Sequence, residues 1–424
     1  MSGLKAGGRC ARFVPAAALA LLGKADCEEV AAGDSVEAVV TVMFVDLRRF
    51  TTLAEAMELD GIVRVLNQWF GCLEPLIAAQ GGFVDKYIGD AVMAVFPGGP
   101  DAALHCAGQL LTAMADLNRQ RVAAGQAPLR AGIGINTGIA ALAAIGSPER
   151  LELTVVGDAV NIASRIEATT KAYGADVLLS EHSYNRLTRP DDFRLRFIDR
   201  ILVRGKQIPL SVYEYFGGDS EPLGKQKAAA QADFDRAVAY YHYGKITDAQ
   251  AAFERCAAAC PGDAVVGEYL RRCQAYRSTG VLERAVEMMA YPQWGPEFSV
   301  GHAVIDAHHR KLFESVALLM RMIDADDYGK LDSVIDFLAK YVDVHFKTEE
   351  RLMEACDYPF YRDHKAQHER FTAVFSCLVE ELADPGTHGA YIAFRVRILV
   401  VDWLLNHTTK SDPHLGKYLA RAAC

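Results

Sequence analysis

The alternation of apolar and polar residues divides the chain into three regions. From about residue 35 to 215, short apolar runs rich in β-branched residues alternate with stretches of helical spacing, which predicts an α/β or α+β domain. Gly, Pro, Ser and acidic residues cluster at 217–224 and indicate a linker. The predicted strands are 39–45, 82–89, 91–96, 129–138, 153–157, 176–180 and 193–203, and the predicted helices are 52–79, 101–123, 158–173 and 181–187.

The other two regions are helical in pattern. Residues 225 to about 289 are rich in Ala, Arg, Glu and Tyr, and FDRAVAYYHYGKITDAQAAFERCAAACPGD resembles one tetratricopeptide unit. A single repeat rarely stands alone, so a connector is a better interpretation than a peptide receptor. From residue 291 onward, helices fit 303–325, 329–355, 361–383 and 388–410, and the short loops between them favour an up-down four-helix bundle.

Composition narrows the function classes. A chain of 424 residues with 51% hydrophobic and 23% charged residues is long enough for two or three globular domains. The net charge of -9 and the isoelectric point near 5.8 argue against a nucleic-acid partner. Ten cysteines without CxxC pairs fit reduced thiols in a cytosol. The apolar run at 13–22 is too short to span a membrane and no small-residue cleavage site follows it, so we expect a cytoplasmic protein with no membrane partner.

Two aspartates follow apolar context in the first region. Asp46 ends the run VTVMFVD, and Asp90 lies in YIGDAVMAVF after a Gly that permits a tight turn. Alone, either Asp is more often a turn residue or a cap than a metal ligand. As a pair at adjacent strand ends, they could hold two divalent ions that align a phosphoryl transfer.

A third motif lies downstream. VVGDAVNIASR places Asn161 and Arg165 four residues apart on one helix face, with Asp158 as the predicted N-cap. An Arg beside an amide donor suits the stabilisation of charge that develops on a phosphoryl oxygen. The same spacing occurs in ordinary amphipathic helices, so this pair is informative only together with the other motifs.

These segments together resemble a class III nucleotide cyclase catalytic domain over about residues 36–216. The matching motifs are TVMFVDLRRFT, DKYIGDAVMAVF, RAGIGINTG, LTVVGDAVNIASR and VRGKQIPLSVYEY. The resemblance implies a ferredoxin-like α+β fold that converts ATP to 3′,5′-cyclic AMP and pyrophosphate. It also implies a homodimer, with Asp46 and Asp90 on one protomer holding two Mg²⁺ or Mn²⁺ ions. Asn161 of the other protomer would orient the ribose, and Arg165 would stabilise the transition state.

The resemblance extends to substrate selection. Lys86 and Thr154 stand where a bacterial subgroup of adenylate cyclases carries a Lys/Thr pair that reads adenine. Lys206 would reach the phosphates. Arg49 departs from the family pattern, which commonly has Gly there, and would alter the turn beside the metals or bring positive charge to the triphosphate.

Histidines and carboxylates recur at ligand spacing in the last region. Residues four apart lie on one helix face, and Pro413 biases Asp412 away from helical conformation, so the chain is predicted to turn there and swing the acid inward. Five imidazoles and two carboxylates from four helices suit two irons that share bridging carboxylates, whereas a structural zinc usually closes with four ligands, commonly including Cys. The candidate ligands are His309, His345, Glu349, His364, His368, His407 and Asp412.

This region resembles bacterial hemerythrin over about residues 291–424, through SVGHAVIDAHHRKLF, HFKTEERLM, HKAQHE and WLLNHTTKSD. The resemblance implies two irons bridged by an oxo or hydroxo group, with an open position for oxygen on one of them. His308, next to His309, is not assigned as a ligand. One iron would be bound by His364, His368 and His407 and the other by His309 and His345, with Glu349 and Asp412 bridging the two.

The sequence therefore predicts an N-terminal helical lead at 1–35, a cyclase domain at 36–218, a helical connector at 219–290 and a di-iron bundle at 291–424. The predicted function is an adenylate cyclase regulated by the oxygen or redox state of the iron, with nitric oxide and peroxide as other candidate inputs. Three alternatives stay open: a constitutive cyclase carrying an uncoupled oxygen- or iron-binding domain, an oxygen-binding module that dimerises through the cyclase half, and a guanylate cyclase.

Overall fold

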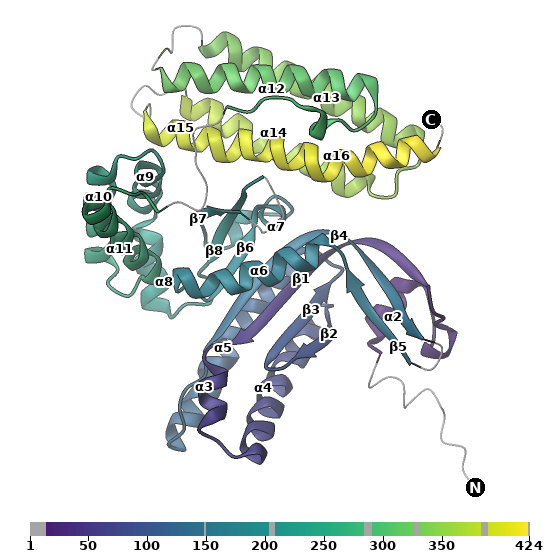
Figure 1. Cartoon of the computed structure of the whole chain (residues 1–424), viewed down its shortest axis with the longest axis vertical. Helices are drawn as coiled ribbons and strands as arrows, with labels where there is room; N and C mark the ends of the chain where they lie inside the picture. Colours follow the sequence, from purple (N-terminus) through teal and green to yellow (C-terminus); the bar gives the residue numbers. More distant parts are fainter. Residues whose placement is uncertain are drawn as a thin grey trace. The chain divides into compact units, whose positions relative to one another are not determined.

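The computed structural model describes residues 14–147, 150–202, 208–283, 291–325, 327, 331–382 and 389–422. The chain divides into two compact units (Figure 1). Unit 1 comprises Met1–Ile198, Val212–Ala230 and Cys260–Glu268, and unit 2 comprises Asp199–Ser211, Gln231–Ala259 and Tyr269–Cys424.

Unit 1 is built on a mixed sheet. In the described part of the chain the sheet has eight strands in the order β2-β3-β1-β4-β6-β8-β7, with β5 paired to β4 off this path. β1 lies antiparallel between β3 and β4, while β4 and β6 run parallel. The strands are β1 Ser35–Leu47, β2 Phe83–Ile88, β3 Ala91–Phe96, β4 Ala131–Ser147, β5 Arg150–Val156, β6 Val177–Ser180, β7 Leu195–Ile201 and β8 Leu210–Tyr215.

Helices cover both faces of this sheet, and the alternation of side chains along β1 explains how. Met43 and Val45 pack into a core with α4 and α5, whereas Val42 and Phe44 pack into a second core with α2 and α6. Because both faces are covered, the strand reads as a continuous apolar run. The helices of the unit are α2 Ala16–Leu22, α3 Phe50–Glu55, α4 Leu59–Ala79, α5 Pro100–Ala123, α6 Asp158–Tyr173, α7 Glu181–Tyr184 and α8 Glu221–Ala229, with 3-10 turns at Cys27–Glu29 and Pro190–Asp192.

Two glycines of β4 let α6 lie unusually close to the sheet. A Cβ atom at Gly134 would fall 2.1 Å from the backbone nitrogen of Glu167, and one at Gly132 would fall 2.9 Å from the Glu167 carboxylate. Any larger residue at these positions would push the helix away. The close packing brings the charged face of α6 to the end of β1, where Asp46 lies.

The predicted α+β fold of this region is confirmed, with local corrections. The predicted helix at 52–79 is interrupted between α3 and α4, and β8 was not among the predicted strands. Asp158 is the first residue of α6 and Gly157, with φ 150°, holds the N-cap position, so the N-cap prediction for Asp158 is wrong. Cys27 is disulfide-bonded, so the expectation of reduced thiols holds only for the seven other described cysteines, which form no disulfide.

Unit 2 is helical apart from its segment Asp199–Ser211. The connector helices α9 Gln231–His242 and α10 Ile246–Ala259 are joined by a short turn, and Phe234, Phe253 and Tyr269 stack between them and α11 Ala264–Thr279. Four long helical segments then form the predicted bundle: α12 Ala303–Asp324, α13 Leu331–Ala355, α14 Tyr361–Leu382, and a last segment made of α15 Ala390–Val396, the π-helical η5 Arg397–Asp402 and α16 Trp403–Ala422 (Figure 1).

The last helix differs from the prediction in one respect. α16 runs through Pro413 to Ala422, so Asp412 is helical and the predicted turn before Pro413 is wrong. Proline removes only one backbone donor from the ladder, and the helix is held on both sides of it by apolar packing. Leu404 belongs to one buried cluster of the bundle, and Leu415 and Leu419 belong to another.

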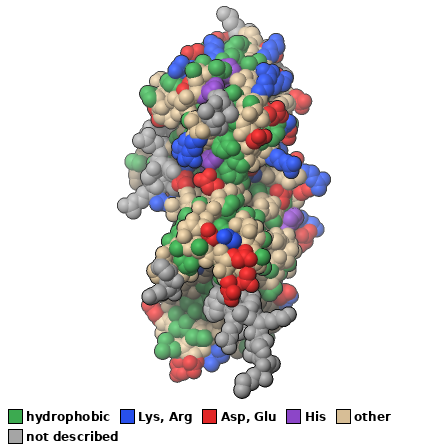
Figure 2. All heavy atoms as spheres, turned by 90° about the vertical axis from the view of Figure 1, so that its right-hand side faces the viewer, with side chains coloured by type: hydrophobic (Ala, Val, Ile, Leu, Met, Phe, Trp, Pro, Cys, Tyr) green, Lys and Arg blue, Asp and Glu red, His purple; other side chains and the backbone are tan. Residues whose placement is uncertain are grey.

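In the described part of the chain, no helix is both long and apolar enough to cross a membrane. On the face drawn in Figure 2, Lys and Arg side chains are interspersed with Asp and Glu. The charge on that face is therefore mixed rather than gathered into one basic patch.

Backbone strain at Arg49 generates a stability prediction. Arg49 lies at φ 59° and ψ 28°, the left-handed conformation, at the N-cap of α3. A residue with a side chain destabilises the folded state by about 1–2 kcal/mol in this conformation. Gly avoids this strain, but part of the gain is offset because Gly loses more conformational entropy on folding. Arg49→Gly should therefore stabilise the chain by about 0.5–1 kcal/mol in denaturant unfolding, whereas Arg49→Ala, which keeps the strain, should not. Equal stability of the two variants would contradict this explanation.

Candidate functional site

The bundle carries a layer of polar residues between two apolar clusters. One cluster contains Leu312, Phe346 and Leu404, and the other contains Met353 and Leu415. Between them, seven side chains from four helical segments meet in two overlapping groups that could hold metal ions. The first group is Glu349, His364, His368 and His407, and the second is His309, His345, Glu349 and Asp412.

Both carboxylates of this layer present one oxygen to each group of imidazoles. Glu349 Oε2 lies 3.4 Å from His364 Nε2 and 3.2 Å from His368 Nε2. Its other oxygen, Oε1, lies 3.7 Å from His345 Nε2. A carboxylate placed between two sets of donors in this way is suited to bridge two cations.

Asp412 repeats this arrangement from the last helix. Its Oδ1 lies 3.3 Å from His364 Nε2 and 3.0 Å from His407 Nε2, and its Oδ2 lies 3.1 Å from His309 Nε2. The structure therefore brings together all seven residues predicted as iron ligands, although Asp412 arrives from a continuous helix and not from a turn.

Three imidazoles converge on one point. His407 Nε2 lies 3.1 Å from His364 Nε2 and 3.2 Å from His368 Nε2. Metal–nitrogen bonds of about 2.1 Å at right angles place neighbouring nitrogens about 3 Å apart. Nitrogen lone pairs this close repel one another unless a proton or a cation lies among them. The spacing fits three ligands on one face of a metal ion.

The burial of this polar layer also indicates a metal site. Glu349 and Asp412 are fully buried, and both oxygens of each lack a hydrogen-bond partner, as does Nε2 of His309, which faces them. Buried polar atoms without partners are costly, and metal coordination would satisfy them. The donor set therefore fits two hard-to-borderline cations such as iron.

Most of these groups are in the protonation state that binds a metal ion, with neutral imidazoles and ionised carboxylates. Burial lowers the pKa of His345 to about 3 and that of His407 to about 4, so both imidazoles are neutral near pH 7. Burial alone would raise the pKa of Asp412, but the imidazoles of His407, His309 and His364 hold it well below its usual range. Burial also opposes charge on His364, yet its contacts with Asp412 and Glu349 raise its pKa to about 9.

One supporting residue escaped the sequence analysis. Glu350 Oε1 lies 3.3 Å from His368 Nδ1, which turns the other ring nitrogen of His368 toward the centre. Ligand imidazoles are commonly oriented by such an outer carboxylate. Its position next to Glu349 was the available signal, but adjacent helical residues point in different directions, so spacing alone did not reveal the contact.

Unit 1 holds the second candidate site. β1 and β3 pair with Val45 opposite Val92, which brings Asp46 and Asp90 to the same end of the two strands. Burial and the charge of Asp46 raise the pKa of Asp90 to about 6. Burial and Asp46 also raise the pKa of Glu167 to about 7. Asp46 thus raises the pKa of two neighbouring carboxylates, and such a cluster of acids favours the binding of cations.

A lysine partly offsets the negative charge of these carboxylates. Lys171 Nζ, on α6, lies 3.3 Å from Asp46 Oδ2. Neither Lys171 nor Glu167 was predicted, because their approach to Asp46 depends on the close packing of α6 over Gly132 and Gly134. The Asp pair fits divalent ions in its chemistry, with oxygen donors at the edge of the sheet.

Lys86 and Thr154 share a hydrogen-bond network between β2 and β5. Lys86 Nζ lies 2.9 Å from Glu152 Oε1 and 3.6 Å from Asp85 Oδ2. Thr154 donates its hydroxyl to the same Asp85 oxygen at 2.8 Å. The two predicted base-reading residues are thus neighbours through Asp85, which was not predicted. Lys206 lies outside the described residues.

The remaining pair stands apart. Asn161 is exposed and Arg165 is half-buried on α6. In the part of the chain that the structure describes, neither side chain makes a hydrogen bond or ion pair with Asp46 or Asp90. One protomer therefore presents two partial sets of predicted catalytic residues.

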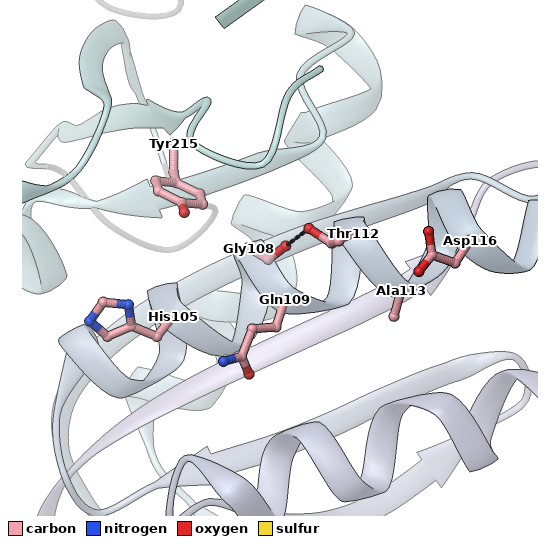
Figure 3. A pocket seen from close by; sticks show the side chains of 8 residues that line it. His105, Gly108, Gln109, Thr112, Ala113, Asp116 and Tyr215 are labelled. Carbon is pink, nitrogen blue, oxygen red and sulfur yellow. Dashed lines mark hydrogen bonds between the residues drawn. The ribbon is translucent and has the colours of Figure 1, made fainter. Parts of the chain in front are cut away.

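A separate hollow of about 460 Å³ lies along α5 (Figure 3). His105, Gln109 and Asp116 line it from the helix, and the ring of Tyr215 points toward Gly108 from β8. None of the predicted catalytic residues lines this hollow, so it takes no part in the function proposed below.

Comparison with known proteins identifies the domain that carries each candidate site. Residues 34–216 match the adenylate and guanylate cyclase catalytic domain, and residues 300–419 match the hemerythrin HHE cation binding domain. This chain joins a class III nucleotide cyclase domain to a hemerythrin domain.

Several of the matching relatives are adenylate cyclases. An adenylate cyclase of Anabaena cylindrica is 39% identical over 48% of this chain and 42% of its own length, and a terminal-differentiation specific adenylate cyclase of Dictyostelium discoideum is 30% identical over 62% of this chain and 12% of its own. The solved adenylyl cyclase CyaB from P. aeruginosa is 29% identical, covering 43% of this chain and 95% of that one, with a TM-score of 0.39. The chain spans less than half of the length of these curated relatives.

The hemerythrin domain offers a matched pair of neighbouring histidines for a test. His309 faces Asp412, whereas His308 stacks edge-on with Tyr341 and is not in either metal group. His309→Gln should lower the iron bound per chain by about half, and His308→Gln should leave it unchanged.

Iron content and thermal unfolding check this. With free iron 100-fold above its Kd, wild-type protein should gain about 2.7 kcal/mol per site, and the His309→Gln protein should gain less. Equal iron loss in the two variants would remove the case for His309 as a ligand.

Proposed function

We propose that this protein is an adenylate cyclase that forms cyclic AMP and pyrophosphate from ATP at a homodimer interface. The observation that carries the proposal is the acidic pair Asp46 and Asp90, together with the Lys86/Thr154 pair, in a domain whose matching relatives include adenylate cyclases. Lys86 favours ATP over GTP as the substrate, because an ammonium group donates to the acceptor N1 of adenine but not to the N–H of guanine.

The chain's own residues divide the work. Asp46 and Asp90 would hold two Mg²⁺ or Mn²⁺ ions, which supply charge neutralisation and activation of the ribose hydroxyl when bound. Arg165 would donate to the phosphoryl oxygens as negative charge develops, and Asn161 would orient the ribose. Lys86 and Thr154 would contact the purine, and Lys206 would reach the phosphates.

Two features of one protomer support a homodimer. Asn161 and Arg165 have no contact with Asp46 and Asp90, so a complete site needs the two sets from different copies. Several large apolar side chains are also exposed, including Leu59, Val63 and Ile88 at 80%, 55% and 50%. Exposed apolar clusters commonly mark interfaces.

Mixing two inactive variants tests both the activity and the dimer. Asp90→Asn and Arg165→Ala should each make almost no cyclic AMP from ATP and Mn²⁺. In a refolded equal mixture, half of the dimers are heterodimers with one intact site of two, so activity should recover to about a quarter of wild type.

A control mixture separates this from trivial rescue. Asp46→Asn with Asp90→Asn leaves both sites broken in every dimer and should recover nothing. If wild type forms no cyclic AMP, the proposed activity is wrong. If it does and the first mixture stays inactive, the site is built within one chain.

We also propose that the state of the hemerythrin site regulates the cyclase. The seven-ligand layer would hold two irons, which supply reversible redox chemistry and an oxygen-binding position when bound. Nitric oxide and peroxide are further candidate inputs, because they would act at the same iron site. The covalent fusion by itself does not require coupling, which needs an element that both sites bias.

Our candidate for such an element is a buried set of contacts in unit 2. Asp402, at the end of the π-helical segment, lies five residues before His407. Its Oδ1 is 2.7 Å from Arg200 Nη2, and its Oδ2 is 3.3 Å from Ser211 Oγ. Arg200 lies in β7 and Ser211 lies in β8 of the cyclase sheet. A shift of the last helix at His407 would therefore act directly on these two residues.

The connector contacts the same end of β7. Asp199 Oδ2 lies 2.8 Å from Arg272 Nη1, and its Oδ1 lies 3.2 Å from His242 Nε2. All of these groups are buried. A buried ion pair adds little net stability compared with apolar packing, but it fixes geometry, because a displaced charge is left uncompensated. These ion pairs therefore favour a segment that changes between discrete positions over one that shifts gradually.

Asp402→Asn tests the regulation. The variant should keep its iron content and iron absorption, while the ratio of cyclic AMP rates before and after oxygen exposure of the di-ferrous protein should fall to about one. Glu381→Gln is the matched control, since it breaks the half-exposed Arg395–Glu381 pair of the same bundle and should keep the wild-type ratio.

If wild type itself shows equal rates with and without oxygen, the uncoupled alternative replaces regulation. If Asp402→Asn responds like wild type, the coupling does not pass through Arg200.

A further inference from the structure

Asp85 carries an arrangement that the proposed mechanism does not use. Its side chain is fully buried, between Lys86 and the end of β5. Oδ1 accepts the backbone N–H of Val155 at 2.9 Å, and Oδ2 accepts the hydroxyl of Thr154 at 2.8 Å. Both oxygens are therefore committed to one strand.

These bonds fix the direction of the Thr154 hydroxyl. Burial raises the pKa of Asp85, but the N–H of Val155, the hydroxyl of Thr154 and the Lys86 ammonium 3.6 Å from Oδ2 all favour the ionised form, which can only accept hydrogen bonds. A hydroxyl has one proton and two lone pairs. With its proton held by Asp85, Thr154 can offer any further partner only an acceptor.

The open face of β5 shows where that partner would bind. Side chains alternate along a strand, so Glu152, Thr154 and Val156 share one face. Glu152 and Val156 are exposed, whereas Thr154 between them is only 7% exposed, and Glu152 holds the Lys86 ammonium at 2.9 Å. Lys86 and Thr154 thus present a fixed donor and a fixed acceptor side by side.

We propose that Asp85 is the positioning residue that makes this cyclase select ATP over GTP, by holding the Thr154 hydroxyl as an acceptor. The inference rests on the proposed adenylate cyclase activity. Adenine carries an exocyclic amino group that donates where guanine carries an oxo group that accepts. An acceptor at Thr154 is complementary to adenine and repels guanine.

Lys86 completes the discrimination. Its ammonium only donates, which suits the acceptor N1 of adenine and opposes the N1–H of guanine. A site built to pair with one hydrogen-bonding pattern rejects the opposite pattern strongly, because its own polar groups are left unpaired. Asp85 touches no substrate atom in this scheme and acts only through Thr154.

The test compares kcat/KM for ATP and for GTP in the full chain with Mn²⁺. In Asp85→Asn the amide still accepts from Val155, but its NH₂ donates to the Thr154 oxygen and frees the hydroxyl proton to meet the guanine oxo group. The ATP/GTP ratio should fall about tenfold or more. Thr154→Val should also lower the ratio, and Thr154→Ser, which keeps the hydroxyl, should restore it.

A double-mutant cycle separates positioning from structure. In the Thr154→Val background, Asp85→Asn should leave the ratio unchanged, since no hydroxyl remains to be turned. Asp101→Asn is the matched control: the Asp101 carboxylate accepts the Thr188 backbone N–H in the same unit, and its loss should not move the ratio.

Three outcomes overturn the inference. One is an Asp85→Asn variant that loses ATP and GTP activity in equal proportion, and another is a change of the ratio that is the same with and without the Thr154 hydroxyl. If Asp85→Asn does not fold, equal ratios for Thr154→Val, Thr154→Ser and wild type overturn it independently. Wild type that forms cyclic AMP while Asp85→Asn keeps its ratio defeats this inference alone, whereas wild type that forms none defeats the proposed activity.

Discussion

Charge confined to an apolar interior governs the hemerythrin domain. Glu349 and Asp412 have no access to water, and an isolated carboxylate in that position is not tolerated without compensation. Five imidazoles from α12, α13, α14 and α16 supply this compensation. The same requirement explains why apolar clusters lie above and below the layer: they exclude water and hold the helices at the spacing that the polar groups demand.

The cyclase domain meets a related constraint at an edge instead of a centre. β1 buries its residues on both faces until Asp46, where the strand ends beside α6. Gly132 and Gly134 remove the atoms that would keep α6 away, and the helix then delivers Glu167 and Lys171 to the carboxylates. The acidic site is thus a product of backbone packing, and its charge is only partly offset by groups of the same chain.

Much of this was predictable from local spacing. His345 with Glu349 and His364 with His368 lie four residues apart, and a helix converts that spacing into a shared face. The strands around Asp46 and Asp90 were predicted because both faces are covered and the apolar runs are continuous. Asp412 lies in the seven-residue layer as expected, but the local reason given for this was wrong, since the helix continues through Pro413.

The contacts that escaped prediction all join segments distant in sequence. Asp85 meets Thr154 across 69 residues, and Arg200 meets Asp402 across 202. Each of these residues reads in isolation as an ordinary polar position of a strand or helix. β8 was missed because LSVYEY mixes apolar and polar residues in a short run, and only its pairing with β6 makes it a strand.

The π-helical segment Arg397–Asp402 has a consequence for how the last helix serves two neighbours. A π-turn accommodates one residue more than an α-turn, and each residue rotates an α-helix by about 100°. The segment therefore sets the phase between the face that carries Asp402 and the face that carries His407. Removing a single residue there would leave both halves helical and well packed in themselves, yet aim one of them at the wrong partner.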